Sequence, residues 1–370
     1  MTIVVATTQG IEGTEYTMVA KRLKMAVTAG TAATVLLGVA ACGQAGDDGT
    51  LVIGGWGGNF SDTTLKTLAQ PFADEAGIEV QFDDAPGEQA ARIRAMAQAQ
   101  NIEWDTVDSF SPEFAFSMYH DGLAAEMPDD VRAELESILP AEMVTSHGIT
   151  FSTTGFVIGC NEDLLDDCPQ SIEDVWDVDK FPGERAMIDR PLIMLTAALA
   201  ADGVAEEDMF PMDLNRAFAK LEEIKPHVRT WYSAGDQFQQ LIREDQVTTG
   251  MWWSGRTTAM AQEGKNASFT WDGAIYEPAQ NMVIKGAHNE ELAWDYLVHL
   301  AGNAEGQAEW ASTMFYGVPS PEALEIMDEE IAKTLPDHPE NKPQMVTPDY
   351  QWYAENREEV EQRWAEFLSN

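Results

Sequence analysis

The sequence predicts an α/β protein of two lobes, because strands and helices alternate in two successive blocks. Apolar runs at 51–55 and 78–82 are each followed by a helical pattern, and a third run lies at 104–110. This order is typical of a mostly parallel sheet covered by helices. A second alternating block starts near Thr150 without an intervening long linker. We therefore expect two lobes that share crossover segments, which suits a length of 370 residues.

The helix after the first strand has an apolar face and a clear end. Its face is formed by Leu65, Leu68 and Phe72, and Gly77 provides the stop. Pro71 interrupts this helix and should kink it. A second helix is expected over 88–100, with Ile93 on its buried side.

The second block supplies the remaining elements. Residues 149–160, ITFSTTGFVIGC, indicate two extended segments around a turn, and further strands are expected over 246–253 and 281–286. Helices are expected over 191–202, after Asp213, over 234–244, from Gly255, after Asn289 and over 350–368.

The N-terminus has the order of an export signal. A basic stretch with Lys21, Arg22 and Lys24 precedes the short apolar segment 25–41, which ends in small residues before Cys42. This length and order are typical of a signal peptide, and the Val-Ala-Ala-Cys ending resembles a lipobox. The alternative is an ordinary signal peptide with a coincidental cysteine.

We therefore expect residues 1–41 to be a leader and signal peptide, and residues 42–50 to be a lipidated Cys42 with a small, polar tether. The true start could be Met1, Met18 or Met25. The mature protein would be an exported lipoprotein that faces the periplasm or the cell exterior.

The charge is strongly acidic, with 63 Asp and Glu against 22 Lys and Arg, or −41 in total. Such a surface repels nucleic acid phosphates, so we expect no nucleic-acid partner. The charge is better explained by a solvated surface than by a cationic ligand.

Signals for catalysis and for metals are lacking. The sequence has no G-x-S-x-G turn and no phosphate loop, and its six histidines never fall at metal-ligand spacing. We expect no catalytic residue, no metal and no cofactor. Cys160 and Cys168 lie eight residues apart and form either a disulfide or two unpaired thiols.

A glycine-rich turn with Trp56, Gly57 and Asn59 follows the first strand. Ligands of open α/β sheets bind at the carboxyl ends of strands, and backbone N–H groups of such a turn can approach a ligand. Aromatic and polar residues at comparable places could complete a cleft. These candidates are Ser109, Phe110, Asp189, Trp253, Glu277 and Tyr316. Each alone is more often a core or surface residue.

The chain resembles the spermidine/putrescine-binding-protein-like family of ABC-importer receptors. The stretches that carry the resemblance, in order, are LVIGGWGGNF, PFADEAGIEV, WDTVDSF, FPGERAMIDRP, MWWSGR and YGVPSPEA. The resemblance implies a two-lobed α/β fold of the type II periplasmic-binding-protein kind, with a ligand cleft between lobes that close by a hinge.

The resemblance also implies roles for single residues. Trp56 matches the aromatic after the first strand, Trp253 matches the tryptophan of a W-N-G-like turn, and Asp189 is the nearest match to an amine-gripping acid. Ile193 or Leu192 stands where a second carboxylate is expected, and Phe110 lies one or two places from the expected aromatic.

The function expected from this resemblance is capture of a small polar solute, a polyamine in the first place, for a membrane permease and its ATPase. A different cargo, such as an amino-acid derivative or a sugar, would be favoured if Arg190 or Arg256 contacted an anion. An exported hydrolase and a structural lipoprotein are further alternatives. We expect a monomer, with one lobe of 51–150 and 281–302 and a second of 151–280 and 303–370.

Overall fold

A computed structural model describes residues 49–369. Within this range eight strands form one mixed sheet in the order β2-β1-β3-β8-β4-β7-β5-β6. β1 runs parallel to β2 and β3, β5 runs parallel to β6 and β7, and β8 is antiparallel to β3 and β4. The strands are β1 (Thr50–Gly55), β2 (Glu79–Asp84), β3 (Thr106–Phe110), β4 (Gly148–Asn161), β5 (Arg185–Ile188), β6 (Val228–Tyr232), β7 (Thr249–Trp253) and β8 (Ala267–Val283).

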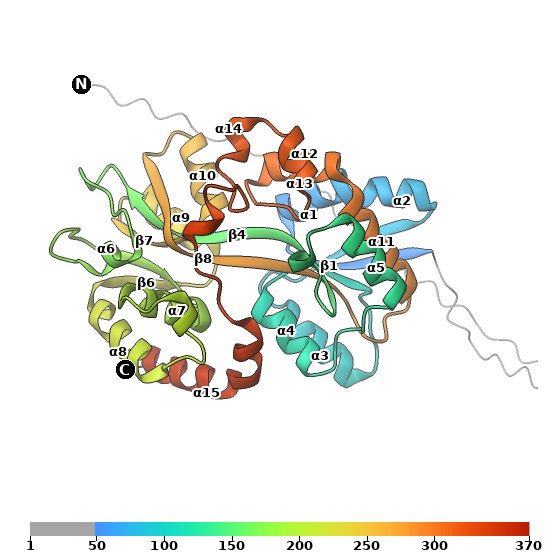
Figure 1. Cartoon of the computed structure of the whole chain (residues 1–370), viewed down its shortest axis with the longest axis horizontal. Helices are drawn as coiled ribbons and strands as arrows, with labels where there is room; N and C mark the ends of the chain where they lie inside the picture. Colours follow the sequence, from blue (N-terminus) through green and yellow to red (C-terminus); the bar gives the residue numbers. More distant parts are fainter. Residues whose placement is uncertain (1–48, 370) are drawn as a thin grey trace, which may run out of the picture. The chain divides into compact units, whose positions relative to one another are not determined.

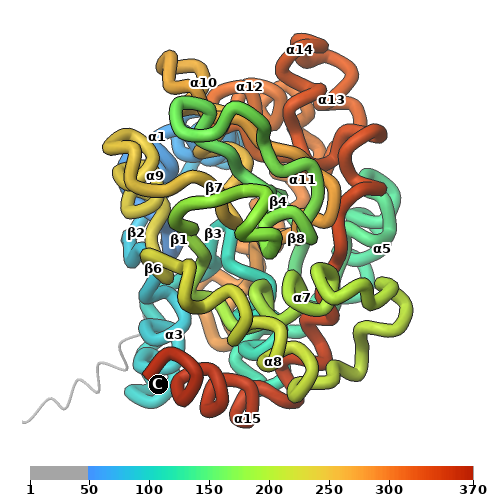
Figure 2. The backbone as a smooth tube through the Cα atoms, turned by 90° about the vertical axis from the view of Figure 1, so that its left-hand side faces the viewer, coloured from blue at the N-terminus to red at the C-terminus, as the bar shows by residue number. Residues whose placement is uncertain are grey.

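Helices lie on both sides of this sheet, with α10 and α12 on one side and α7, α8 and α15 on the other (Figure 2). The first half contains α1 (Gly58–Thr64), a π-helical turn (Leu65–Ala69), α2 (Gln70–Ala76), α3 (Gln89–Ala99), α4 (Pro112–His120), α5 (Asp129–Ile138) and α6 (Ile172–Trp176). The second half contains α7 (Pro191–Ala201), α8 (Leu214–Ile224), α9 (Gly235–Arg243), α10 (Ser254–Gln262), α11 (Glu290–Gly302), α12 (Ala304–Met314), α13 (Pro321–Ile326), α14 (Glu329–Ala332) and α15 (Tyr350–Ser369).

Helix ends follow the local sequence signals in most places. Gly77 ends α2 with φ 70°, and the Asp213 side chain accepts a hydrogen bond from the Arg216 backbone N–H at the start of α8. Asn289 behaves differently from the expected cap. Its side chain donates to the Thr50 carbonyl at 2.8 Å, so it connects α11 to β1 instead.

The expected turn within 149–160 is wrong, because β4 is one continuous strand of 14 residues. The polar and small residues around Gly155 suggested a turn, but these residue types are required there by the packing of neighbouring side chains. A Cβ at Gly155 would lie 2.6 Å from the Trp271 ring, and the Thr154 hydroxyl lies 3.1 Å from that of Ser254. β8 likewise starts 14 residues before the expected Asn281 and pairs with β4 over most of its length. These two strands run side by side across the middle of the molecule (Figure 1).

The hydrophobic cores lie on either side of these two long strands. Two cores surround β1 and β3, and include Ile53, Trp104 and Leu297. A larger core surrounds β5 to β7, and includes Ile188, Trp252 and Phe238. We call the elements around the first two cores the first lobe and those around the third core the second lobe.

These cores divide the C-terminal segment, which was expected to belong entirely to the second lobe. Trp310 and Val318 are buried with the residues of β1 and α11, because α12 packs on the first helices of the chain. Val360, Trp364 and Phe367 of α15 are buried in the second-lobe core. The chain therefore crosses between the cores again after α14.

Cys160 at the end of β4 and Cys168 are joined as a disulfide in the second lobe. The leader, the signal peptide and the lipidated Cys42 lie outside the described residues. Among residues 49–369, each helix is too short or too polar to span a membrane.

Candidate functional site

The carboxyl ends of the parallel strands of both lobes meet near the middle of β4 and β8. Trp253 at the end of β7 pairs with Phe156 of β4, and Glu277 of β8 pairs with Thr154 of β4. In open α/β sheets this edge is where ligands bind. The side chains at these strand ends therefore define the candidate site.

Arg190 connects the two lobes at this edge. It precedes α7 in the second lobe, and its guanidinium pairs with Glu113 at the start of α4 in the first lobe. Its Nη1 also lies 2.5 Å from Oε1 of Glu277 on β8. The side chains of Glu113 and Glu277 are each 5% exposed and that of Arg190 is 15% exposed. We call these three residues the Arg190 triad.

The Arg190 triad has one positive and two negative formal charges in a buried place. Burial raises the pKa of Glu113, while Arg190 lowers it and Glu277 raises it further. Burial opposes the charge of Arg190, but Glu113 and Glu277 more than offset this and raise the pKa of its guanidinium. Oε2 of Glu113 and Nε of Arg190 are buried and have no hydrogen-bond partner within the described chain. Such unpaired buried groups can form hydrogen bonds with a ligand: the carboxylate oxygen as an acceptor and the N–H as a donor.

Aromatic rings flank the Arg190 triad on the side of the second lobe. The guanidinium lies 5.2 Å from the centroid of Phe156, which lies 5.2 Å from the ring of Trp253. Tyr232 packs 5.5 Å from Trp253, and its hydroxyl donates to the Met251 carbonyl. These rings exclude water from the charges, which strengthens electrostatic interactions there.

A second cation, Arg256, lies close to the same aromatic group. It occupies the first turn of α10, and its Nη1 lies 3.3 Å from Oε1 of Gln239. Tyr316 is half-buried; its burial raises the pKa of its hydroxyl, while the charge of Arg256 lowers it. Burial raises the pKa of the Tyr232 hydroxyl, and the charges of Arg190 and Arg256 both lower it, so the two cations share one neighbourhood.

Trp56 and Ser109 meet at the carboxyl ends of β1 and β3. The indole Nε1 of Trp56 donates to the Ser109 carbonyl at 3.0 Å. Ser109 has φ 48°, an uncommon conformation for a residue other than glycine. Gly57 donates its N–H to the Ser61 hydroxyl, which donates to Asp84 at 2.7 Å. The expected glycine-rich turn is therefore anchored to the end of β2.

The predicted site residues fall into two groups. The structure brings Trp253 and Glu277 together around Arg190, places Tyr316 beside Arg256 and joins Trp56 to Ser109. Phe110, Asp189 and Asn59 have other partners. Phe110 is 1% exposed in a first-lobe core, Asp189 accepts a hydrogen bond from the Trp364 indole at 2.7 Å, and Asn59 is exposed and contacts Met314.

Glu113, Phe156 and Tyr232 were missed by sequence reasoning. Glu113 follows the end of β3 by three residues, after Ser111 and Pro112 at the start of a helix. The position alone would have nominated it, since it lies at the same sheet edge as Ser109. The role of Phe156 could not be recognised because a turn was expected within β4.

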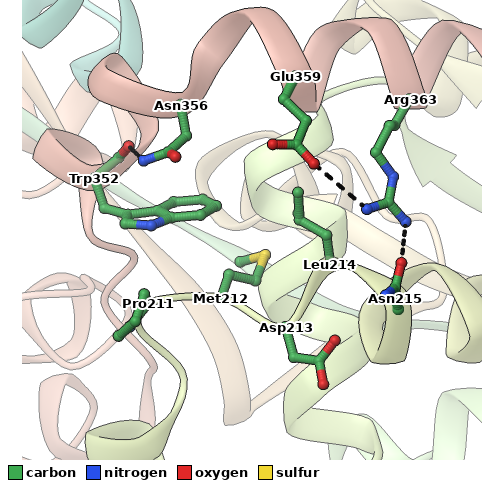
Figure 3. A pocket seen from close by; sticks show the side chains of 9 residues that line it. All are labelled: Pro211, Met212, Asp213, Leu214, Asn215, Trp352, Asn356, Glu359 and Arg363. Carbon is green, nitrogen blue, oxygen red and sulfur yellow. Dashed lines mark hydrogen bonds and ion pairs between the residues drawn. The ribbon is translucent and has the colours of Figure 1, made fainter.

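A hollow of about 360 Å³ lies away from this site, between α15 and the start of α8 with the residues before it. Figure 3 shows Trp352 and Met212 facing it, with Arg363 bonded to Asn215 and Glu359 at one side. None of the charged residues that meet at the strand ends lines this hollow.

Comparisons with known proteins agree on the class of protein. The family model of the bacterial extracellular solute-binding protein matches residues 67–342. The γ-aminobutyric acid-binding protein of Pseudomonas aeruginosa is 28% identical over 333 residues, covering 89% of this chain and 93% of that protein.

Two solved structures give the same picture. The Atu4243–GABA receptor is 34% identical with a TM-score of 0.77, and covers 86% of this chain and 97% of that one. An ABC transporter substrate-binding protein from Bradyrhizobium japonicum is 31% identical with a TM-score of 0.80, and covers 86% and 99%. The spermidine/putrescine-binding PotD of Streptococcus pneumoniae, at 18% identity and a TM-score of 0.69, shares the fold.

The chain thus has the two-lobed α/β fold of type II periplasmic binding proteins. Its relatives are receptors of ABC importers, which bind small solutes and work with a membrane permease and an ATPase, and they are not enzymes. The family model covers well over half of the chain, so this protein belongs to the bacterial extracellular solute-binding proteins.

Proposed function

We propose that this receptor captures a small zwitterionic amino acid of the γ-aminobutyrate (GABA) class between its lobes and delivers it to an ABC permease. The observation that carries the proposal is the Arg190 triad at the carboxyl ends of the strands, with Arg256 in the same neighbourhood. Buried groups of positive and of negative charge suit a ligand that itself carries both charges.

The relatives support this class of cargo. The Pseudomonas aeruginosa relative binds GABA, and the Atu4243 structure is that of a GABA receptor. These are statements about those two proteins, and the charges around Arg190 are the reason to extend them to this chain. Closure of the lobes on the ligand would be driven by contacts that only the closed state makes.

A polyamine fits these charges less well, although the sequence favoured it. Glu113 and Glu277 would suit an amine, but a diamine has a second cation that must avoid Arg190 and Arg256. Like charges brought together in a buried site cost free energy. Putrescine therefore serves as the competing cargo in the test below.

The membrane attachment completes the proposal. Diacylation of Cys42 would keep the receptor beside its permease, since one diacyl group and an amide-linked chain give stable anchoring. Within the importer, a monomer would suffice. Labelling of cells with a radioactive fatty acid should mark the wild-type protein and not a Cys42→Ser variant.

Isothermal titration of the purified protein tests the cargo. The ligands are GABA, β-alanine, 5-aminovalerate, putrescine, spermidine, succinate and glucose. We expect saturable binding of at least one of the three amino acids, at least tenfold tighter than of either polyamine. Tighter binding of putrescine, of succinate or of glucose would overturn the assignment of the cargo.

A further inference from the structure

At the strand ends the first lobe presents acids and no Lys or Arg, whereas the second lobe presents two arginines. The first lobe supplies Glu113, the exposed Asp84 at the end of β2 and the buried Asp108 of β3. The four residues directly after each of β1, β2 and β3 (56–59, 85–88 and 111–114) contain no Lys or Arg. The second lobe supplies Arg190 after β5 and Arg256 after β7. Its acids at such positions are Asp189, which accepts the Trp364 indole N–H, and Asp236.

From this division we infer an orientation for the ligand: its ammonium group faces Glu113 of the first lobe, and its carboxylate faces Arg256 of the second. The inference rests on the proposed function. It makes Glu113 the residue that selects for an amine and Arg256 the residue that selects for a carboxylate. Arg190 is then an internal counter-ion rather than the partner of the ligand's carboxylate.

The charge of the Arg190 triad is the first argument for this orientation. Two carboxylates and one guanidinium leave one negative charge in a buried place. An ammonium group beside them brings the sum to zero, whereas a carboxylate would bring it to minus two. In a place of low dielectric this difference dominates the choice between the two orientations.

An unused hydrogen-bond acceptor is the second argument. Oε1 of Glu113 faces Arg190, but its Oε2 is buried without a partner within the described chain. Glu113 itself is 4% exposed. A buried carboxylate oxygen gains most from a donor that has a positive charge, and an ammonium group is such a donor.

The surroundings of Arg256 are the third argument. It is exposed, pairs with the neutral Gln239 and interacts with the Tyr316 hydroxyl, and no ion pair joins it to a carboxylate of the described residues. It also lies in the first turn of α10, where backbone N–H groups favour an anion. A carboxylate can therefore bind there without displacing an existing ion pair.

Crossing ligands with variants tests the orientation. GABA, 4-hydroxybutyrate, which lacks the ammonium, and 4-amino-1-butanol, which lacks the carboxylate, are titrated into wild type, Glu113→Gln and Arg256→Gln. Glu309→Gln is the matched control, because Glu309 pairs with Lys66 on the exposed surface. Such cycles isolate the coupling between one residue and one ligand group.

We expect Glu113→Gln to lower the affinity for GABA at least tenfold and to remove the preference of GABA over 4-hydroxybutyrate. The preference over 4-amino-1-butanol should remain, and Arg256→Gln should show the reverse pattern. A Glu113→Gln protein that keeps the preference for the amine, or an Arg256→Gln protein that keeps the preference for the carboxylate, overturns the orientation.

Two further outcomes are also decisive. If Glu113→Gln fails to fold by circular dichroism, the Arg256→Gln arm alone decides, since that side chain is exposed. If wild type binds none of the amino acids, the proposed cargo fails, and this result is distinct from a ligand that binds the other way round.

Discussion

Nη1 of Arg190 lies 2.5 Å from Oε1 of Glu277, and the same guanidinium pairs with Glu113 of the other lobe. Three charged groups from three elements thus meet where the two lobes face each other. Each of them is costly to bury unless the others are present. The triad is therefore important to stability as well as to binding.

Replacing Arg190 should destabilise the fold strongly. Arg190→Met leaves Glu113 and Glu277 buried without their counter-ion, and such a loss costs about 3–5 kcal/mol. Urea unfolding followed by tryptophan fluorescence measures it. Arg216→Gln, which removes an exposed pair with Asp202, should cost less than about 1 kcal/mol. Equal small losses in both variants would show that the triad is not formed in solution.

Asp108 should make stability fall as the pH rises. Burial raises the pKa of Asp108 to about 6 in the folded protein, whereas an unfolded chain has a value of about 4. Between these values only the folded state holds the proton, so this group's contribution is present below pH 4 and is lost as the pH rises through 6. The loss is about 3 kcal/mol.

Asp108→Asn isolates this contribution from other titrating groups. His147 acts in the opposite direction, since burial lowers its pKa to about 4. Wild type and variant should differ progressively more between pH 4 and pH 7 in their free energy of unfolding, with the variant favoured at the higher pH. A difference that stays constant with pH would contradict the assignment.

Asp189 should matter for stability and not for the ligand. Its carboxylate accepts the Trp364 indole N–H, which ties β5 to α15. Asp189→Ala should lower the free energy of unfolding by about 1–3 kcal/mol, because a partly buried donor is left unpaired. The Kd for GABA should stay within twofold of wild type. Asp208→Ala, at an exposed site, serves as control. A tenfold rise in Kd would restore the role that the sequence suggested.

Gly155 should tolerate no side chain. A Cβ there would lie 2.6 Å from the Trp271 ring, so Gly155→Ala should cost about 1–3 kcal/mol in thermal unfolding. Gly302→Ala is the control, because nothing lies within 4 Å of a Cβ at this helical position. That substitution should be neutral or stabilising. Comparable melting temperatures in both variants would place Trp271 away from β4.

The alternation of strands and helices could be predicted from the sequence, since each strand of the first lobe is a short apolar run with a helix after it. The length of β4 and β8 could not. Thr153, Thr154 and Gly155 favour a turn locally, but cross-strand pairing with β8 and packing by Trp271 override that preference.

The candidate site was predicted in part for a related reason. Trp253 is the last residue of β7, where position alone indicates a role, whereas Glu277 lies within β8, which crosses the ends of the other strands. Asp189 also lies at a strand end, but α15 returns from the far end of the chain to bond it. The position of Glu113 just after β3 could be read from the sequence, but its partner Arg190 lies 77 residues away, so no local pattern could reveal their pairing.

Native mass spectrometry of the purified protein in an equimolar mixture of GABA, putrescine, succinate and glucose tests the central claim most directly. We predict that a complex with GABA is the dominant bound species, and that it is strongly reduced for Glu113→Gln. A dominant complex with putrescine, succinate or glucose, or protein that stays free of all four, would contradict the account.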